Sequence, residues 1–391
     1  MYRPLLATVL APALATAALV APGAPVHAGP PAHASGHPRP HHAPDVQVQQ
    51  NATTWSVSWD APGRHQVFAS TDPRDPSRSG RLVGSAARGT LEVSGLSRDR
   101  RWYFEVASQR QVQQAGKKPA RVRGVIASSR SLDLDSTSNT RDLGGMRTSD
   151  GRSVRWGVLF RSDAVVAPTA RDSAILQGLN LATSADFRAE PEIVKDGANQ
   201  YPAGVRQLFV PLLDDSTTAL SEAIQAVLRG GDPAVAHELL GDGKAEQIAA
   251  TGPSKMISRP AVRAAFSELL RELANGGTPM IFNCTAGKDR TGVFAAVVQR
   301  LLGVPEKTVL ADYELSNQYR AAYNERTYAF LQSVGVDPAL LRPLMEQSGA
   351  NLANMFRSVE RDYGSFDAFV RDGLGLDKST VKALRAQLLV G

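Results

Sequence analysis

The sequence predicts an α/β domain preceded by a small all-β sandwich. An apolar run at 279–282 is followed by a loop of small residues and then by apolar residues at helical spacing. This order of strand, loop and helix is typical of an α/β domain. Between 45 and 131, short alternating runs are separated by turns, which favours an antiparallel sandwich. The 391 residues are enough for two domains that each bury a core.

The N-terminal residues predict a targeting segment and a leader. Residues 1–28 contain an arginine, an apolar run and then small residues up to Ala28, the layout of a cleaved secretory signal peptide. A membrane anchor is the rival interpretation, but Pro12 interrupts the run and no stop-transfer charges follow it. Residues 29–44 are rich in Pro, Ala and His without periodicity, which predicts a disordered leader. We therefore expect a secreted, extracellular protein with no integral membrane span after cleavage.

Residues 45–131 alternate apolar and polar side chains in short runs. The alternating apolar positions include Trp55, Val57, Trp59, Leu91, Val93, Trp102, Phe104 and Val106. The segments 55–62 and 96–106 resemble a fibronectin type III module. We expect the tryptophans to fill the core of this sandwich, and an exposed carbohydrate-binding or adhesive face is the alternative.

Between Ser216 and Leu273, apolar residues recur at helical spacing on both sides of Gly230-Gly231. The pattern predicts helices. Both a helical lid over the functional site and a packed helical insertion fit it.

The only cysteine of the chain, Cys284, lies in the loop between the predicted strand and the predicted helix, six residues before Arg290. Backbone N–H groups at a helix N-terminus are unpaired, and with the positive end of the helix dipole they form an anion site. A cysteine beside such amides and basic side chains is favoured as the nucleophilic thiolate. The pattern predicts Cys284 as the nucleophile of a phosphoryl transfer and Arg290 as a two-pronged phosphate clamp.

The other residues of this loop are predicted to bind the substrate. Small residues let the backbone curl closely around a tetrahedral anion, and Lys288 adds a positive charge that suits substrates with more than one phosphate. The predicted substrate-binding residues are Thr285, Ala286, Gly287, Lys288, Thr291 and Gly292. A lone cysteine is more often an inert buried side chain, but the unbroken order of strand, loop, basic residues and helix favours the chemical role.

A departing alkoxide or phenoxide needs a proton donor, and three aspartates are candidates. Asp289 is preferred, because a carboxylate without a role inside the loop would repel an anionic substrate. Asp214 and Asp215 follow a predicted strand end, where catalytic groups are common. A solvated turn is the alternative for that pair.

The loop 284–292, with the sequence CTAGKDRTG, is similar to that of the bacterial tyrosine-phosphatase family that also acts on phosphoinositides. Further similar segments are 139–145, 151–152, 157–162, 312–317 and 363–366. The resemblance implies a cysteine-dependent phosphatase domain over 132–391, with a central sheet flanked by helices. It also implies hydrolysis of phosphomonoesters through a phosphocysteine without metal or other cofactor. The implied partners are phosphorylated proteins, at phosphotyrosine, phosphoserine or phosphothreonine, or phosphoinositides.

Asn283 departs from the pattern of this family, which has histidine immediately before the cysteine. Histidine can carry a positive charge that favours the thiolate, whereas asparagine can only form hydrogen bonds. An active phosphatase is therefore one hypothesis. The alternative is a phosphate- or phosphoinositide-binding protein with weak or no turnover.

The formal net charge of +6 and the isoelectric point near 9.5 predict attraction to anionic surfaces. The basic residues are spread along the chain, and no nucleic-acid-binding motif is present. A single cysteine allows no internal disulfide.

Overall fold

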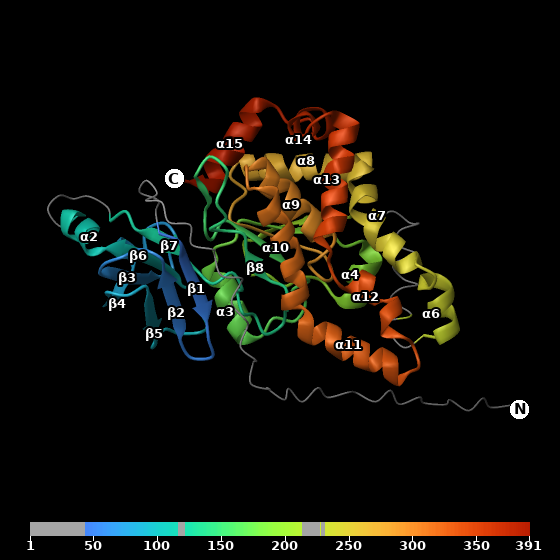
Figure 1. Ribbon diagram of the computed structural model, residues 1–391, viewed down its shortest axis with the longest axis horizontal. Helices are drawn as coiled ribbons and strands as arrows, with labels where there is room; N and C mark the ends of the chain where they lie inside the picture. Colours follow the sequence, from blue (N-terminus) through green and yellow to red (C-terminus); the bar gives the residue numbers. More distant parts are fainter. Residues whose placement is uncertain (1–43, 116–121, 213–226, 228–230) are drawn as a thin grey trace, which may run out of the picture. The chain divides into compact units, whose positions relative to one another are not determined.

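The computed structural model describes residues 44–391 except 116–121, 213–226 and 228–230 (Figure 1). The predicted signal peptide, residues 1–28, lies outside the described residues, as does the predicted leader up to residue 43. Asp214 and Asp215 also lie outside them, so their proposed roles stay predictions.

Two antiparallel sheets form the first part of the described chain. One has the strand order β1-β2-β5 and the other the order β4-β3-β6-β7. Their strands are β1 Val46–Gln50, β2 Trp55–Trp59, β3 His65–Ser70, β4 Arg81–Ala86, β5 Thr90–Val93, β6 Tyr103–Ser108 and β7 Val125–Ala127, with short helices α1 Pro76–Ser79 and α2 Gln109–Ala115.

The alternating residues of these strands meet in one apolar core. Trp55 and Trp59 on β2 are buried together with Phe104 on β6. The prediction that these two tryptophans fill a core is therefore confirmed. Trp102 is only partly buried, and its indole N–H donates to the Ser97 carbonyl at 2.7 Å. The likeness to a fibronectin type III module stays a prediction.

A five-stranded sheet organises the second part, with the order β12-β11-β13-β10-β8. All neighbours pair in parallel except β8, which is antiparallel to β10. The strands are β8 Arg141–Asp142, β10 Leu159–Ser162, β11 Thr183–Asp186, β12 Arg206–Phe209 and β13 Met280–Asn283. β9 Ser153–Val154 and β14 Leu389–Val390 form a separate pair. The predicted strand at 279–282 is thus observed, shifted by one residue, at the centre of the sheet.

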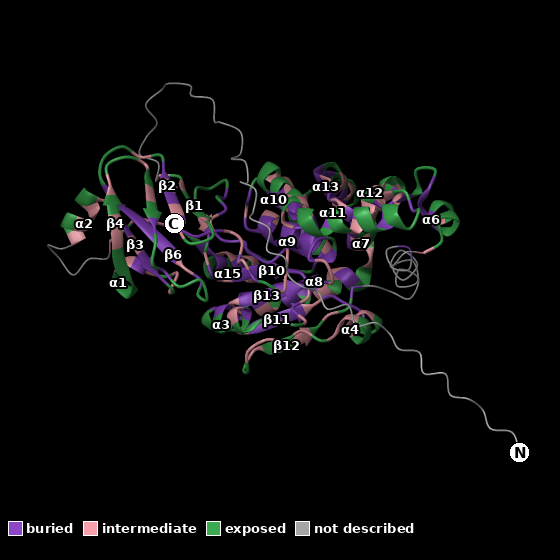
Figure 2. Cartoon of the chain, turned by 90° about the horizontal axis from the view of Figure 1, so that it is seen from below, coloured by how far each residue is buried: buried purple, intermediate pink, exposed green. Residues whose placement is uncertain are grey.

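Helices bury both faces of this sheet. On β13, Met280 and Phe282 point into the main core with Phe294 of α9, whereas Ile281 points into a second core with Ile175 of α3. This alternation follows from the two-residue period of a strand. Figure 2 shows the buried residues concentrated in β13 and α9, while α11 is largely exposed.

The helices are α3 Ala170–Gly178, α4 Glu190–Asp196, α6 Pro233–Leu240, α7 Lys244–Ser258, α8 Pro260–Ala274, α9 Arg290–Leu301, α10 Glu306–Tyr319, α11 Ala321–Ser333, α12 Arg342–Met345, α13 Gly349–Tyr363, α14 Phe366–Ala368 and α15 Lys378–Leu388, with short turns at Pro338–Leu340 and Phe369–Gly373. None of the helices within the described ranges is long and apolar enough to cross a membrane. The part of the predicted helical pattern after Gly231 is observed in α6, α7 and α8, whereas most of the part before it, 216–226 and 228–230, lies outside the described residues. Phe266 and Leu270 of α8 belong to the main core, and both the lid and the packed insertion stay predictions.

Candidate active site

Cys284 directly follows β13, and α9 begins six residues later at Arg290. The connecting loop is tight because Gly287 has a left-handed backbone, with φ of +65°. A Cβ at that position would collide with the backbone of Ser162 and Asp163 at the end of β10. Only glycine therefore lets the loop pass this close to the neighbouring strand.

Donors outside the loop hold most of its carbonyl oxygens. Backbone amides donate to two of these carbonyls: Phe187 N to Asn283 O at 2.8 Å, and Ala164 N to Thr285 O at 3.3 Å. Asn139 Nδ2 donates to both Ala286 O at 3.1 Å and Gly287 O at 3.0 Å. Gly287 O also accepts from Arg161 Nη2 at 2.9 Å. By contrast, the amides of residues 285–289 donate to no acceptor in the part of the chain that is described. Carbonyls held from behind leave a concave row of unpaired N–H groups, which is an anion site.

A buried ionic cluster supports the loop from behind. Asp312 accepts from Arg161 Nη1 at 3.1 Å and from Arg141 Nε at 3.3 Å, and all three side chains are at most 3% exposed. Burial opposes ionisation of Asp312, but the two guanidinium groups outweigh it and hold its pKa below the usual range. Burial and the charge of Arg141 lower the pKa of Arg161 to about 10. Because two cations share one carboxylate, the cluster keeps a positive charge near the loop.

Arg290 is anchored by Glu192, a residue that the sequence analysis did not identify. Arg290 Nη1 and Nη2 each donate to one carboxylate oxygen of Glu192 at 2.6 Å. Nη1 also donates to the Phe187 carbonyl at 3.0 Å. A guanidinium has five N–H donors, so Nε–H and the second hydrogen of Nη2 remain. These two form the side-on fork that can grip two oxygens of a phosphate.

Glu192 also contacts the loop and its own helix. It accepts from Thr285 Oγ1 at 2.7 Å and from the backbone N–H of Ala189 at 2.9 Å. Burial alone would raise the pKa of Glu192, but hydrogen bonds and the charge of Arg290 lower it from 4.5 to about 2. Glu192 is therefore ionised at neutral pH. The only sequence signal for it is an acidic residue in the first turn of the helix after β11.

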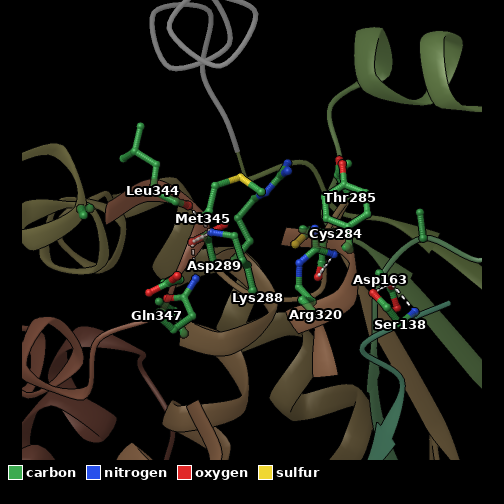
Figure 3. Close-up of a pocket in the computed structure, with 18 of the residues that line it drawn as sticks. Ser138, Asp163, Cys284, Thr285, Lys288, Asp289, Arg320, Leu344, Met345 and Gln347 are labelled. Atoms are coloured by element: carbon green, nitrogen blue, oxygen red, sulfur yellow. Dashed lines mark hydrogen bonds and ion pairs between the residues drawn. The ribbon is translucent and has the colours of Figure 1, made fainter. Parts of the chain in front are cut away.

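Lys288 and Asp289 pair with each other, as Figure 3 shows. Lys288 Nζ donates to Asp289 Oδ1 at 2.9 Å and to the Leu344 carbonyl at 2.6 Å. Gln347 Nε2 donates to the same aspartate oxygen at 2.7 Å. The side chain of Asp289 is 53% exposed at the cavity surface. Partial desolvation favours its neutral form, but the charge of Lys288 and these hydrogen bonds keep its pKa below the usual value. Asp289 therefore holds Lys288 as a carboxylate.

Asn283 is fully buried at the end of β13, in a network of polar side chains. Its Nδ2 donates to Asp186 Oδ1 at 3.2 Å, and its Oδ1 accepts from Asn199 Nδ2 at 3.0 Å. Asp186 in turn forms an ion pair with Arg188 at 2.7 Å. Asn283 therefore ties the strand end to neighbouring segments, but it adds no positive charge beside the cysteine.

These residues surround a cavity of about 1250 Å³. Of the residues predicted from sequence, the cavity is lined by Cys284, Thr285, Ala286, Lys288, Asp289 and Arg290. Gly287, Thr291 and Gly292 do not line the cavity. Gly292 packs against Tyr313, and Thr291 Oγ1 is buried without a hydrogen-bond partner among the described residues. The cavity is also lined by residues of α7, namely Thr251, Gly252, Pro253, Lys255 and Met256. Within the described ranges, no group of three or more His, Cys, Asp and Glu residues is arranged to hold a metal ion.

Comparison with known proteins places the site in context. A model described as "Tyrosine phosphatase family" matches residues 132–390. A protein of Cupriavidus necator named as a tyrosine-protein phosphatase is 34% identical over 260 residues, covering 66% of this chain and 89% of the relative. The triple specificity protein phosphatase PtpB of Mycobacterium tuberculosis is 26% identical over 278 residues, covering 66% of this chain and 98% of the relative. The crystal structure of P. aeruginosa TpbA is 20% identical, covers 50% of this chain and 89% of its own, and has a TM-score of 0.22.

Proposed function

The chain belongs to the tyrosine phosphatase family, and on that premise we propose that it hydrolyses phosphomonoesters at Cys284 through a phosphocysteine. The observation that carries this proposal is the set of unpaired donors around the cysteine. The amides of residues 285–289 and the side-on fork of Arg290 lack acceptors in the described chain. Both kinds of donor suit the equatorial oxygens of a phosphoryl group in the transition state.

The proposed reaction has two displacements. In the first, the sulfur of Cys284 forms a bond to phosphorus while the ester P–O bond breaks, and the departing oxygen takes a proton from an acid. In the second, water attacks the phosphorus, the P–S bond breaks, and inorganic phosphate leaves. The hydroxyl of Thr291, which has no partner among the described residues, is available to donate to the sulfur as it departs.

The carboxylate of Asp289 accepts from Lys288 Nζ and Gln347 Nε2, and the charge of Lys288 helps to keep its pKa below the usual value. A carboxylate paired in this way with a cation is less suited to carry a proton than one without such a partner. Glu192, with a pKa of about 2, is unsuited for the same reason. We therefore propose Asp214 or Asp215 for this role, and we assign to Asp289 the positioning of Lys288.

The phosphorylated substrate is a protein in our proposal, because the chain is a member of a tyrosine phosphatase family. Phosphoserine, phosphothreonine and phosphoinositides remain proposed substrates in addition, consistent with the triple specificity of the Mycobacterium tuberculosis relative. Secretion and attraction to anionic surfaces are also proposals, and they rest on residues 1–28 and on the net charge of +6.

Asn283 supports a second candidate function, the capture of phosphate with little turnover. Its amide is held between Asp186 and Asn199 and supplies no charge to the cysteine. In that case the donors of the loop bind phosphate, but the thiolate is less favoured than beside a histidine.

The deciding experiment compares the wild-type protein without its signal peptide, Cys284→Ser and Asn283→His on an aryl phosphate, a phosphotyrosine peptide and a phosphoinositide, without added metal. We expect turnover by the wild type, none by Cys284→Ser, and rapid-quench trapping of phosphate on the wild type alone. Equal rates for the wild type and Cys284→Ser would refute nucleophilic catalysis by this cysteine. Stoichiometric phosphate binding without turnover, with turnover restored in Asn283→His, would favour the second candidate.

A further inference from the structure

The cavity is lined by more basic side chains than the proposed phosphate site around Cys284 requires. Seven basic side chains line it, namely Lys195, Lys255, Arg259, Lys288, Arg290, Arg320 and Arg326. Lys288 and Arg290 are neutralised by Asp289 and Glu192. In contrast, Lys255, Arg320 and Arg326 have no carboxylate partner among the described residues. This excess lies at one side of the site, on α7 and around the junction of α10 and α11.

The acidic side chains of the cavity do not cancel this charge, because each has another partner. Asp135 pairs with Arg171, Asp163 accepts from the backbone N–H groups of Ser138 and Asn139, Asp196 lies 3.9 Å from Lys195, and Glu346 pairs with Arg342. Within the described residues, these three cations therefore line the cavity without an ion-pair partner.

Arg320 is the member of this group that lies closest to the catalytic loop. It is only 7% exposed. Among the described residues its Nε has no partner, and its side chain makes one hydrogen bond, a long one of 3.4 Å from Nη1 to the Ala286 carbonyl. Its guanidinium carbon lies 4.4 Å from the centre of the Tyr323 ring, a cation–π contact. Figure 3 shows this side chain directed at the loop that holds Cys284. A buried guanidinium with most of its donors unused needs further acceptors, and the described chain offers only the Ala286 carbonyl.

We propose that Arg320 and Arg326 form an anion subsite that selects phosphotyrosine peptides with acidic residues close to the phosphotyrosine. The proposal rests on the proposed phosphatase function and adds the substrate class. Arg320 is the N-cap of α11, and Arg326 lies six residues later, roughly 9 Å further along the helix axis at about 1.5 Å per residue. An extended peptide advances about 3.3 Å per residue, so carboxylates two or three residues apart would reach both arginines. The exposed Arg326 contacts the outer carboxylate, and the buried Arg320 contacts the inner one.

The subsite differs from the role that the sequence analysis gave to Lys288. Lys288 has a carboxylate partner 2.9 Å away and also donates to the Leu344 carbonyl. The charge of Lys288 is thus already balanced by Asp289 within the protein. Recognition of a second negative group falls instead to Arg320 and Arg326, which have no carboxylate partner among the described residues.

The test uses two phosphotyrosine peptides that are identical except that glutamates beside the phosphotyrosine are replaced by glutamines in one of them. We expect the wild type to prefer the acidic peptide by about five- to tenfold in kcat/KM, the range for partly exposed charge pairs and charge-assisted hydrogen bonds. In Arg326→Gln and Arg320→Gln the ratio should fall towards one. Arg110→Gln is the matched control, because Arg110 on α2 is exposed and does not line the cavity. It should keep the wild-type ratio.

Two results would overturn the proposal: equal kcat/KM for both peptides in the wild type, or an unchanged ratio in both arginine variants. A third arm measures kcat/KM for a short-chain phosphoinositide. If the arginine variants lose kcat/KM only for that lipid, the proposal is overturned in favour of a site for the lipid headgroup. An aryl phosphate, which has no flanking residues, separates this outcome from failure of the phosphatase function. Cys284-dependent turnover of the aryl phosphate without any peptide preference refutes the subsite alone. Arg320→Gln also removes the hydrogen bond to the Ala286 carbonyl of the catalytic loop. Arg326→Gln tests the subsite without changing a contact of that loop.

Discussion

Replacing Glu192 by glutamine tests whether the position of Arg290 limits catalysis. Glu192 binds Arg290 through two hydrogen bonds of 2.6 Å and Thr285 through a third of 2.7 Å. Glutamine keeps one oxygen acceptor but replaces the other with an NH₂ group, which cannot accept from a guanidinium. The variant thus loses one of the charged hydrogen bonds and the negative charge that holds the arginine.

The size of the effect follows from that loss. A hydrogen bond between charged groups contributes about 1.5 to 3 kcal/mol. If the transition state loses the same amount of stabilisation by Arg290, kcat/KM falls roughly ten- to a hundredfold, at about 1.4 kcal/mol per factor of ten. The loss should appear mainly in kcat, since the loop amides still bind the phosphate.

The pH dependence of stability has a defined sign. The pKa of Glu192 is lowered from 4.5 to about 2 in the folded protein. A carboxyl group with a depressed folded pKa stabilises the fold at pH values above its unfolded pKa. The stability difference between wild type and Glu192→Gln should therefore be fully present above about pH 4.5 and should shrink as the pH falls towards 2.

The assay is steady-state hydrolysis of an aryl phosphate, with urea unfolding at several pH values. Glu190→Gln serves as the control, because Glu190 is an exposed glutamate in the same helical turn. It should retain wild-type kinetics. An unchanged kcat/KM in Glu192→Gln would refute the positioning role. A higher kcat/KM would refute it too, because it would mean that Glu192 competes with the phosphate for Arg290.

Two further predictions concern the loop. Asn139→Ala removes the hydrogen bonds from Asn139 Nδ2 to the Ala286 and Gly287 carbonyls and from Arg141 Nη1 to Asn139 Oδ1, so we expect a loss of about 1.5 to 4.5 kcal/mol in the free energy of unfolding, at roughly 0.5 to 1.5 kcal/mol per hydrogen bond. Urea denaturation checks it against the exposed Asn354→Ala, and equal stabilities would contradict the support that we assign to Asn139. Asp289→Asn should slow the hydrolysis of aryl and alkyl phosphates by similar factors, because we expect it to misplace Lys288 and leave the proton donor intact. A loss confined to the poor alkyl leaving group would show instead that Asp289 is the acid.

The sequence predicted those features of the site that are contiguous along the chain. Cys284 and Arg290 lie six positions apart between a strand and a helix, and both line the cavity. The apolar residues of α9 recur with a helical period, and Val293, Val297 and Leu301 are all buried. Such patterns are readable because neighbours in a strand or helix are set by local backbone geometry.

The hydrogen-bond partners of Asp289 could not be predicted from local sequence. The carboxylate lies in a predicted anion site, which suggested a proton donor. The hydrogen bond from Gln347, 58 positions away, and the pairing with Lys288 determine its ionised state. The protonation state of a group depends on every charge and dipole near it in space, and for Asp289 these include Gln347 from a distant segment.

By itself, the sequence predicted which loop would bind phosphate and which residue would attack it, and it contained the departure from the family pattern at Asn283. The tertiary structure decided how that loop is held and what charge remains around it. Glu192 lies 98 positions before Arg290, and Asn139 lies 147 positions before the carbonyl that it supports. These partners meet only because β8, β10, β11 and β13 converge in one sheet. The order of strands in a sheet is set by packing of the whole chain, so the balance of charge in the cavity becomes visible only once the chain is folded.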